Sequence, residues 1–163
     1  MPRRVAAGDN AGMTRFAPLM DVALAEARAA GARGEIPVGA AIAAPDGATL
    51  LARAGNRGRE LDDPTAHAEI LAIRAACAAL GSDRLTGCTL YVTLEPCPMC
   101  AAAISFARVA RLVYGASDPK SGGVEQGPRV FSHPQAHHAP EVVAGVAEAD
   151  CAALLREFFT ALR

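Results

Sequence analysis

The feature that most constrains the fold of this chain is a pair of short motifs, His67-Ala68-Glu69 and Pro96-Cys97-Pro98-Met99-Cys100. The chain between them is long enough for a helix and a strand. His67, Cys97 and Cys100 are residue types that bind zinc, so the fold must bring the two motifs together. A structural zinc site normally has four protein ligands, whereas a catalytic site has three and keeps the fourth position for water. Three ligands, with Glu69 left over, indicate a catalytic site.

Other residues of the same types have simpler explanations. Cys88 is the nearest candidate for a fourth ligand, but a small buried residue is the better interpretation, as it is for Cys77 and Cys151. Glu95 could be catalytic, although a carboxylate that accepts backbone hydrogen bonds at a strand end is the simpler reading. A second metal site is conceivable at three histidines, which in a Pro-containing loop are more often solvent-exposed: His133, His137 and His138.

Length and composition indicate one ordinary globular domain. The chain has 163 residues, and we expect a disordered tail over residues 1–13 and a single domain over residues 14–163. Apolar residues make up 52% of the chain and charged residues 20%, which is usual for such a domain. The formal net charge of -1 excludes a strongly basic protein. Any nucleic-acid partner must therefore contact a local basic patch.

The sequence also indicates the compartment. Residues 1–13 contain no apolar core of a secretory signal, and no apolar run of about 18 residues could span a membrane. Five cysteines, two of them in a C-x-x-C pair, are more typical of metal binding in a reducing compartment than of a disulfide framework. We therefore expect the protein in the cytoplasm.

Hydrophobic periodicity predicts strands that alternate with helices. Helices are expected over residues 16–30, where Gly31 ends the run, and over residues 66–80, 97–106 and 148–162. Strands are expected over residues 36–44, 49–54, 89–94, 109–114 and 142–146, and Pro45-Asp46-Gly47 joins the first two as a hairpin. Residues 116–138 are rich in loop signals. This order predicts an α/β layered fold.

The motifs also predict a chemistry. The C-x-x-C pair opens a predicted helix, where the positive end of the helix dipole favours thiolates even before a metal binds. His67 adds a neutral ligand, so zinc and two thiolates sum to about zero net charge. Water at such a site has a pKa lowered towards about 7. Glu69 is close enough in sequence to take the proton from this water and pass it to a substrate.

Two longer stretches carry a resemblance to a known family. Residues 63–70 read D-P-T-A-H-A-E-I and residues 89–101 read T-L-Y-V-T-L-E-P-C-P-M-C-A, and together they resemble the bacterial tRNA-specific adenosine deaminases. Further similar segments lie at residues 35–40, 56–57, 115–120 and 154–159, so the resemblance covers about residues 15–163. It implies a cytidine-deaminase-like α/β fold of three layers, with a five-stranded mixed sheet between helices, usually assembled as a homodimer.

The resemblance also implies an activity and its main residues. The reaction would be hydrolytic conversion of the wobble adenosine, position 34, of an arginine tRNA to inosine, with release of ammonia. His67, Cys97 and Cys100 would hold one Zn²⁺ per subunit, and Glu69 would be the general acid and base. Residues 1–13 have no counterpart in the family, and the loop over residues 122–131 differs from it.

Substrate contacts are implied by the resemblance at six positions. A hydrogen bond to the flipped base is expected from the Asn56 side chain, and a contact with the base edge from the Ala68 backbone. The loop that touches the anticodon backbone and sugars holds Asp118 and Lys120, and the C-terminal helix that helps to close the RNA site holds Phe158 and Phe159. Each of these last four also has a plainer interpretation, as a turn residue, a solvated charge or part of the core.

Three functions remain open at this point. The first is an enzyme acting on adenosine in an RNA loop, and the second is the same chemistry on a free base such as guanine or cytosine. The third is a zinc-stabilised RNA-binding module without catalysis, which needs a fourth protein ligand and is disfavoured by an aromatic content of 4%. A positive rim around the pocket would favour RNA, and the candidates for it are Arg57, Arg59, Lys120, Arg129 and Arg156.

Overall fold

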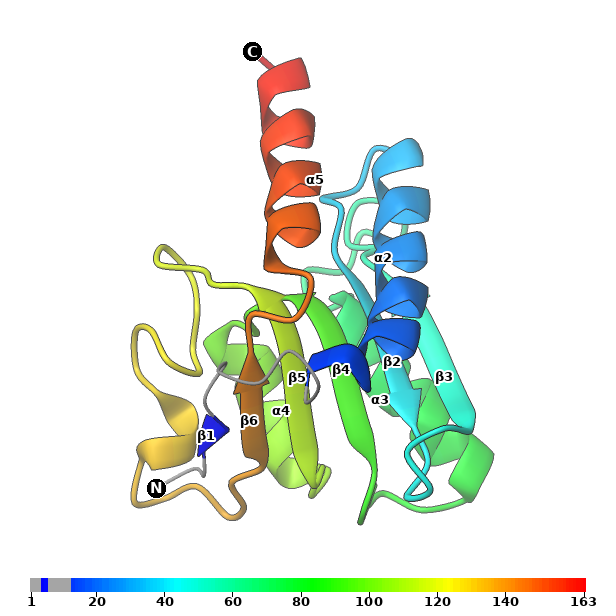
Figure 1. Ribbon diagram of the computed structural model, residues 1–163, viewed down its shortest axis with the longest axis vertical. Coiled ribbons are helices and arrows are strands. Elements are labelled where there is room, and N and C mark those ends of the chain that lie inside the picture. The colour runs from blue at the N-terminus through cyan, green and yellow to red at the C-terminus, as the bar shows by residue number, and fades with distance from the viewer. Residues whose placement is uncertain (1–3, 6–12) are drawn as a thin grey trace.

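The computed structural model describes residues 4–5 and 13–163, which form three layers (Figure 1). A central sheet is covered on one face by α2 (Ala17–Ala32) and α5 (Glu148–Ala161), and on the other by α3 (Ala68–Leu80) and α4 (Pro98–Phe106). Each face of the sheet has its own cluster of buried apolar residues. The predicted three-layer α/β fold is confirmed.

The sheet is mixed, with the order β1-β6-β5-β4-β2-β3 within the described residues. Its strands are β1 (Arg4–Val5), β2 (Gly39–Ala43), β3 (Leu50–Gly55), β4 (Thr89–Leu94), β5 (Arg111–Ala116) and β6 (Glu141–Ala144). β2 is antiparallel to β3 and β4, whereas β4, β5 and β6 run parallel. The five strands β2 to β6 are the predicted mixed sheet.

The N-terminal segment adds to this sheet. The sequence predicts a disordered tail over residues 1–13, but residues 1–3 and 6–12 lie outside the described part of the chain. Within the described part, β1 pairs in parallel with β6 at the edge of the sheet. The sequence did not predict this short strand.

The end of the first helix also differs from its prediction. Gly31 does not end the helix, because α2 continues to Ala32. The chain turns at Gly34 instead, which has a φ of 84°, a left-handed conformation that glycine adopts without strain. The N–H groups of Arg33 and Gly34 donate to carbonyls of the last helical turn, as is usual at a helix end.

The central strands β4 and β5 place the candidate site. Both are buried along nearly their whole length, as expected for strands with helices on both faces. β4 ends at Leu94, and the chain passes through Pro96 to α4 within a few residues. The start of α3 lies at the same edge of the sheet (Figure 1), so two helix N-termini meet there. In the described part of the chain, no helix has the length and apolar character needed to cross a membrane.

Candidate active site

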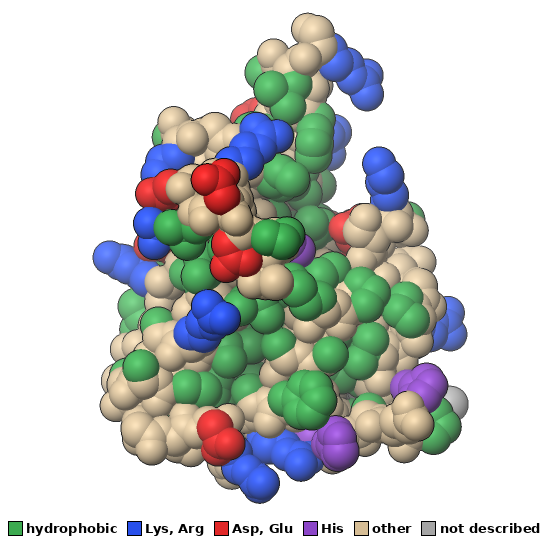
Figure 2. Space-filling view, turned by 180° about the vertical axis from the view of Figure 1, so that it is seen from behind, with side chains coloured by type: hydrophobic (Ala, Val, Ile, Leu, Met, Phe, Trp, Pro, Cys, Tyr) green, Lys and Arg blue, Asp and Glu red, His purple; other side chains and the backbone are tan. Residues whose placement is uncertain are grey.

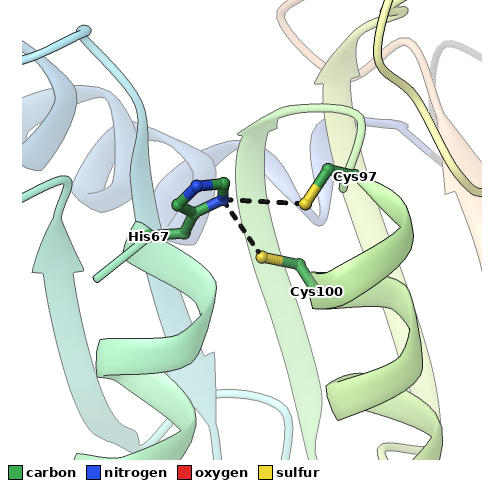
Figure 3. A group of neighbouring side chains, drawn as sticks. All are labelled: His67, Cys97 and Cys100. Carbon is green, nitrogen blue, oxygen red and sulfur yellow. Dashed lines mark hydrogen bonds between the residues drawn. The ribbon is translucent and has the colours of Figure 1, made fainter. Parts of the chain in front are cut away.

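Three predicted metal ligands meet between the starts of α3 and α4. His67 immediately precedes α3, Cys97 immediately precedes α4, and Cys100 lies in the first turn of α4. The Nδ1 atom of His67 lies 3.6 Å from Cys97 Sγ and 3.4 Å from Cys100 Sγ. Figure 3 shows the imidazole directed from α3 towards both sulfurs.

This geometry fits one zinc ion. The three donor atoms lie within 4.8 Å of one another. A nitrogen and a sulfur bound to one tetrahedral zinc at usual bond lengths are separated by about 3.6 Å, close to both distances above. One histidine nitrogen and two thiolates are also a donor set that zinc prefers. The three residues are therefore placed to bind one zinc ion per chain.

The alternative metal sites are not found. Across residues 4–5 and 13–163, no other group of three such side chains is close enough to hold a metal. Cys88 does not join the three ligands; it is fully buried, and its Sγ is 3.9 Å from the Thr86 carbonyl oxygen. His138 Nε2 contacts the Val109 carbonyl oxygen at 2.7 Å. The fourth ligand that a closed structural site requires is thus missing from the described residues.

The protonation of the two cysteines is uneven before a metal binds. A hydrogen bond from Cys100 lowers the pKa of the Cys97 thiol to about 4. The pKa of Cys100 is raised, because its thiol donates this hydrogen bond. A hydrogen bond with Cys97 raises the pKa of His67. Metal binding by both sulfurs requires that both thiols lose their protons.

Glu69 lies beside the ligands and is almost completely buried, with 4% of its surface exposed. Its Oε2 atom is buried and has no hydrogen-bond partner among the described residues. Burial raises the pKa of this carboxyl, and the charges of His67 and Cys97 act on it as well. A buried polar atom without a partner is costly, so such an atom beside three metal ligands marks a position for a further polar group.

Asn56 and Ala68 lie together next to this group. The Ala68 N–H donates a hydrogen bond of 2.8 Å to Asn56 Oδ1. At its other end the Asn56 amide donates from Nδ2 to the carbonyl oxygen of Ile36 at 3.2 Å. The side chain therefore connects the end of β3 to the start of α3. A base that contacts Asn56 must share or replace these hydrogen bonds.

Asp118 and Lys120 lie in the loop after β5. Asp118 Oδ1 accepts hydrogen bonds from the N–H groups of Lys120 and Ser121, which is the turn that the sequence favours as the plainer interpretation. Lys120 itself is exposed.

Phe158 and Phe159 lie in the second half of α5, where their rings form an edge-to-face contact at 5.4 Å. Phe159 is 46% exposed. Figure 1 shows that these last turns of α5 rise away from the sheet. The phenylalanines therefore come from a different part of the molecule than the ligand helices.

The predicted positive rim converges only in part. Arg57 lines a cleft together with Arg33 and Arg53, which the sequence did not indicate. Arg57 and Arg33 both pair with Glu60, at 2.9 Å and 3.6 Å. The other rim candidates are exposed but do not line this cleft: Arg59, Lys120, Arg129 and Arg156.

Glu35 is a further residue of this region that the sequence did not single out. It is buried, and its carboxylate accepts hydrogen bonds from the N–H groups of Arg59 and Glu60. These bonds hold the loop that follows Asn56. The available signal was a charged residue directly before the apolar run that enters β2, although burial of that charge could not be predicted from it.

Known proteins with similar sequences include zinc-binding deaminases. Residues 13–116 match the family model described as the cytidine and deoxycytidylate deaminase zinc-binding region. The tRNA-specific adenosine deaminase of Agrobacterium fabrum (strain C58) is 62% identical over 140 residues, which is 86% of this chain and 91% of that protein.

Solved structures of deaminases also superpose on this chain. A structure from a study of A-to-I editing by tRNA:A34 deaminases at the wobble position superposes with a TM-score of 0.82 at 61% identity, covering 85% of this chain and 99% of the other. The guanine deaminase of Nitrosomonas europaea superposes with a TM-score of 0.75 at 27% identity, covering 98% of this chain and 88% of the other. The fold is thus shared by two kinds of purine deaminase, and the sequence is far closer to the first.

Proposed function

Because this chain belongs to the zinc-binding cytidine and deoxycytidylate deaminase family, and within it to the tRNA-specific adenosine deaminases, we propose that it converts the wobble adenosine, position 34, of a tRNA anticodon to inosine. The observation that carries the chemistry is a three-ligand metal group beside a buried carboxylate with an unpartnered oxygen. The observation that carries the substrate is the high identity to deaminases of tRNA.

The reaction needs a nucleophile and a proton carrier. A zinc ion held by His67, Cys97 and Cys100 would supply the Lewis acidity that makes a water molecule nucleophilic at neutral pH. Glu69 takes a proton from this water and delivers it to the ring nitrogen of the adenine as the water oxygen bonds to C6. Glu69 then carries the proton of the new C6 hydroxyl to the amine, the C6–N6 bond breaks as the C6 carbonyl of inosine forms, and the amine leaves as ammonia. Burial raises the pKa of the Glu69 carboxyl above its ordinary value.

Binding of the flipped base is assigned to the residues around this centre. Asn56 and the Ala68 backbone hold the base edge, and they already lie together at the start of α3. The anticodon backbone and sugars meet the exposed turn formed by Asp118 and Lys120. Phe158 and Phe159 lie on α5, away from the ligand helices, where the exposed ring of Phe159 is proposed to stack on a base of the RNA outside the metal site.

The substrate is tested with an anticodon stem-loop RNA that carries adenosine at position 34. The protein should convert this nucleotide to inosine, as measured by mass spectrometry of the digested RNA, and release one ammonia per inosine. A matched stem-loop with guanosine at position 34 and adenosines elsewhere in the loop is the control and should release no ammonia. Equal reaction at every loop adenosine would contradict a wobble-specific enzyme.

A free-base deaminase is the second candidate, because a guanine deaminase shares the fold over nearly the whole chain. The two candidates differ in whether RNA is needed. Free guanine and free cytosine are therefore incubated with the same protein preparation, and ammonia is measured. Turnover of guanine without turnover of the stem-loop would replace the first proposal by the second.

The arginine tRNA is the proposed natural substrate, because the family that this chain resembles acts on it. Incubation with total bacterial tRNA, followed by sequencing of each species for inosine, identifies the tRNA directly.

A tRNA substrate also means that the enzyme works where tRNA is found, so the cytoplasm is its proposed location. The proposed functional unit is the single deaminase domain of residues 14–163, to whose sheet β1 adds an edge strand.

A homodimer is the proposed assembly. A groove of about 710 Å³ lies between α4 and residues 128–137, and Phe106 in its wall is 67% exposed. Figure 2 views the molecule from the side of α3 and α4 and shows hydrophobic side chains gathered across this face. Exposed apolar surface of this extent is common at interfaces between subunits.

The dimer is tested by light scattering after size-exclusion chromatography. Phe106→Asp should change the molar mass from that of two chains to that of one. Leu162→Asp is the matched control, because Leu162 is similarly exposed, at 61%, but follows α5. A dimer that survives Phe106→Asp would move the interface away from this groove.

A further inference from the structure

Glu95 is a buried carboxylate for which the reaction above has no use. It follows the last residue of β4 and lies two residues before Cys97, with 2% of its surface exposed. No Lys or Arg of the described residues forms an ion pair with it. A buried carboxylate without a counter-charge is expensive unless hydrogen bonds compensate it.

Backbone N–H groups from a distant loop supply this compensation. Oε1 accepts from Asp118 N and Ser117 Oγ, both at 3.3 Å. Oε2 accepts from three successive backbone N–H groups, at 3.0 to 3.2 Å, which belong to Val124, Glu125 and Gln126. Successive N–H groups aimed at one point form an anion-binding nest, and here the anion is a side chain of the protein.

The two oxygens therefore hold the two ends of one loop. Oε1 contacts the end that leads into the Asp118–Lys120 turn, and Oε2 contacts the end that runs on to residue 126. Within the loop, the Gly122 N–H donates to the Asp118 carbonyl oxygen at 2.9 Å. The carboxylate thus closes residues 117–126 into a compact unit around itself.

The same loop lies against the metal ligands. The Gly123 N–H donates to the Pro96 carbonyl oxygen at 2.8 Å. A Cβ atom at Gly123 would lie only 2.5 Å from the backbone nitrogen of Pro98, so the loop backbone contacts the start of α4 directly. Glu95 and Gly123 therefore fix the loop relative to Cys97.

We propose that Glu95 is a positioning residue, which holds the Asp118–Lys120 turn at a fixed place relative to the zinc ligands so that the turn can receive the RNA backbone. The role rests on the proposed function, because it acts through contacts with RNA that Asp118 and Lys120 make. It predicts a defect in substrate binding rather than in metal binding or in the chemical step.

Glu95→Gln is the sharpest variant. With the amide nitrogen at the position of Oε1, Ser117 Oγ can accept a hydrogen bond, but the Asp118 N–H loses its acceptor. The oxygen at the position of Oε2 still accepts from residues 124–126. The variant should therefore fold and bind zinc while releasing the Asp118 end of the loop. For the stem-loop RNA, KM should rise about tenfold with kcat changed less than about threefold, as follows from one unsatisfied, partly buried N–H.

Hydrogen exchange without RNA tests the positioning independently of activity. In Glu95→Gln, the amides of Asp118, Lys120 and Ser121 should exchange about tenfold faster, because the turn opens more often. Glu35→Gln is the matched control: Glu35 is also buried and accepts two backbone N–H groups, but from Arg59 and Glu60. It should speed exchange in its own loop and leave Asp118 unchanged.

A double variant shows whether Glu95 acts through the turn. If it does, Lys120→Ala should raise KM in the wild type and raise it much less in Glu95→Gln, so the two effects are not additive. Unchanged exchange at Asp118, an unchanged KM, additive effects or loss of zinc would each overturn the proposal. A wild-type protein without activity on the stem-loop would defeat the proposed function instead, and the exchange experiment would still decide whether Glu95 holds the loop.

Discussion

Glu69 differs from the other buried carboxylates in what its oxygens contact. Glu35 and Glu95 accept backbone N–H groups, whereas Oε2 of Glu69 has no partner in the described part of the chain. The first two carboxylates stabilise loops and gain nothing from a mobile proton. Glu69 has a free lone pair beside the metal ligands, which is the arrangement that a proton carrier requires.

Replacing Glu69 by Gln should therefore separate metal binding from turnover. We expect Glu69→Gln to retain one zinc per chain and to lose inosine formation by about a hundred- to ten-thousand-fold, the usual contribution of a general acid and base. Zinc is measured by plasma mass spectrometry and inosine by nucleoside analysis. Glu141→Gln is the control, because Glu141 pairs with Arg111 at the other end of the parallel strands. Near-normal turnover in zinc-loaded Glu69→Gln would remove Glu69 from the mechanism.

The sequence could predict residues that belong to local motifs, and it could not predict partners from distant segments. His67, Cys97 and Cys100 were recognisable because zinc ligation prescribes residue types and spacing. The backbone hydrogen bonds of Glu95 were foreseen as a type, but their donors lie over twenty residues away. The burial of Glu35 was not foreseen, since glutamate side chains are rarely buried without a partner.

At the level of secondary structure, α2 lies unusually close to β2. An added Cβ at Gly39 would lie 2.0 Å from the Ala23 carbonyl oxygen and 2.5 Å from the Ala27 backbone nitrogen. Both neighbours belong to the helix backbone, which cannot move as a side chain can. Gly39 therefore sets the distance between this helix and the sheet.

Gly39→Ala should consequently destabilise the protein strongly. We expect a loss of about 3 kcal/mol or more in the free energy of unfolding, because overpacking against backbone forces the helix away from the sheet. Gly47→Ala is the control: its φ is 76°, but an added Cβ would have no atom within 4 Å, so only backbone strain of about 1 kcal/mol applies. Urea unfolding monitored by circular dichroism measures both. Equal losses would show that α2 can move.

The sequence predicted which segments form helices and which form strands more accurately than it predicted the residues at which they end. Apolar periodicity located the helices α2 to α5, and short apolar runs bounded by turn signals located the strands β2 to β6. The predicted end of α2 was wrong, since Gly31 lies inside the helix, where an added Cβ would come within 3.3 Å of Pro37 Cβ. Contacts of this kind come from tertiary packing, which a local pattern does not record.

For the whole molecule, a buried thiol links stability to alkaline pH. Burial raises the pKa of Cys151 to about 11, from an ordinary value of 9.0. Above pH 9 the unfolded chain loses this proton, while the folded chain keeps it until about pH 11. The stabilisation is therefore fully present below pH 9 and is lost as pH rises towards 11, by about 3 kcal/mol in total.

Cys151→Ala should flatten this part of the pH dependence. The variant loses some packing at every pH, but the difference from the wild type should shrink between pH 9 and pH 11. Cys77, Cys88 and Tyr91 also have raised pKa values through burial, and they remain in both proteins, so the comparison isolates Cys151. The measurement is urea unfolding at each pH. A constant difference would contradict a neutral buried thiol.

Removal of zinc should affect activity more than the fold. Both faces of the sheet carry buried apolar clusters that do not depend on a metal. After chelation we expect the loss of one zinc per chain, complete loss of inosine formation, unchanged far-ultraviolet circular dichroism, and a thermal midpoint lower by about 5–10 °C. Restored zinc should restore all three properties. A chelated protein that unfolds at room temperature would show that the metal holds the fold.

The position of β4 at the centre of the sheet has a consequence for synthesis on the ribosome. β4 separates the two ligand-bearing helices in sequence and pairs with β2, made earlier, and with β5, made later. The ligands can therefore reach their final separation only after long-range pairing is complete, which is a slow step in folding. Metal capture should come last during biogenesis. In a cell that is short of zinc, folded but inactive enzyme would accumulate, and binding of one zinc ion per chain would activate it.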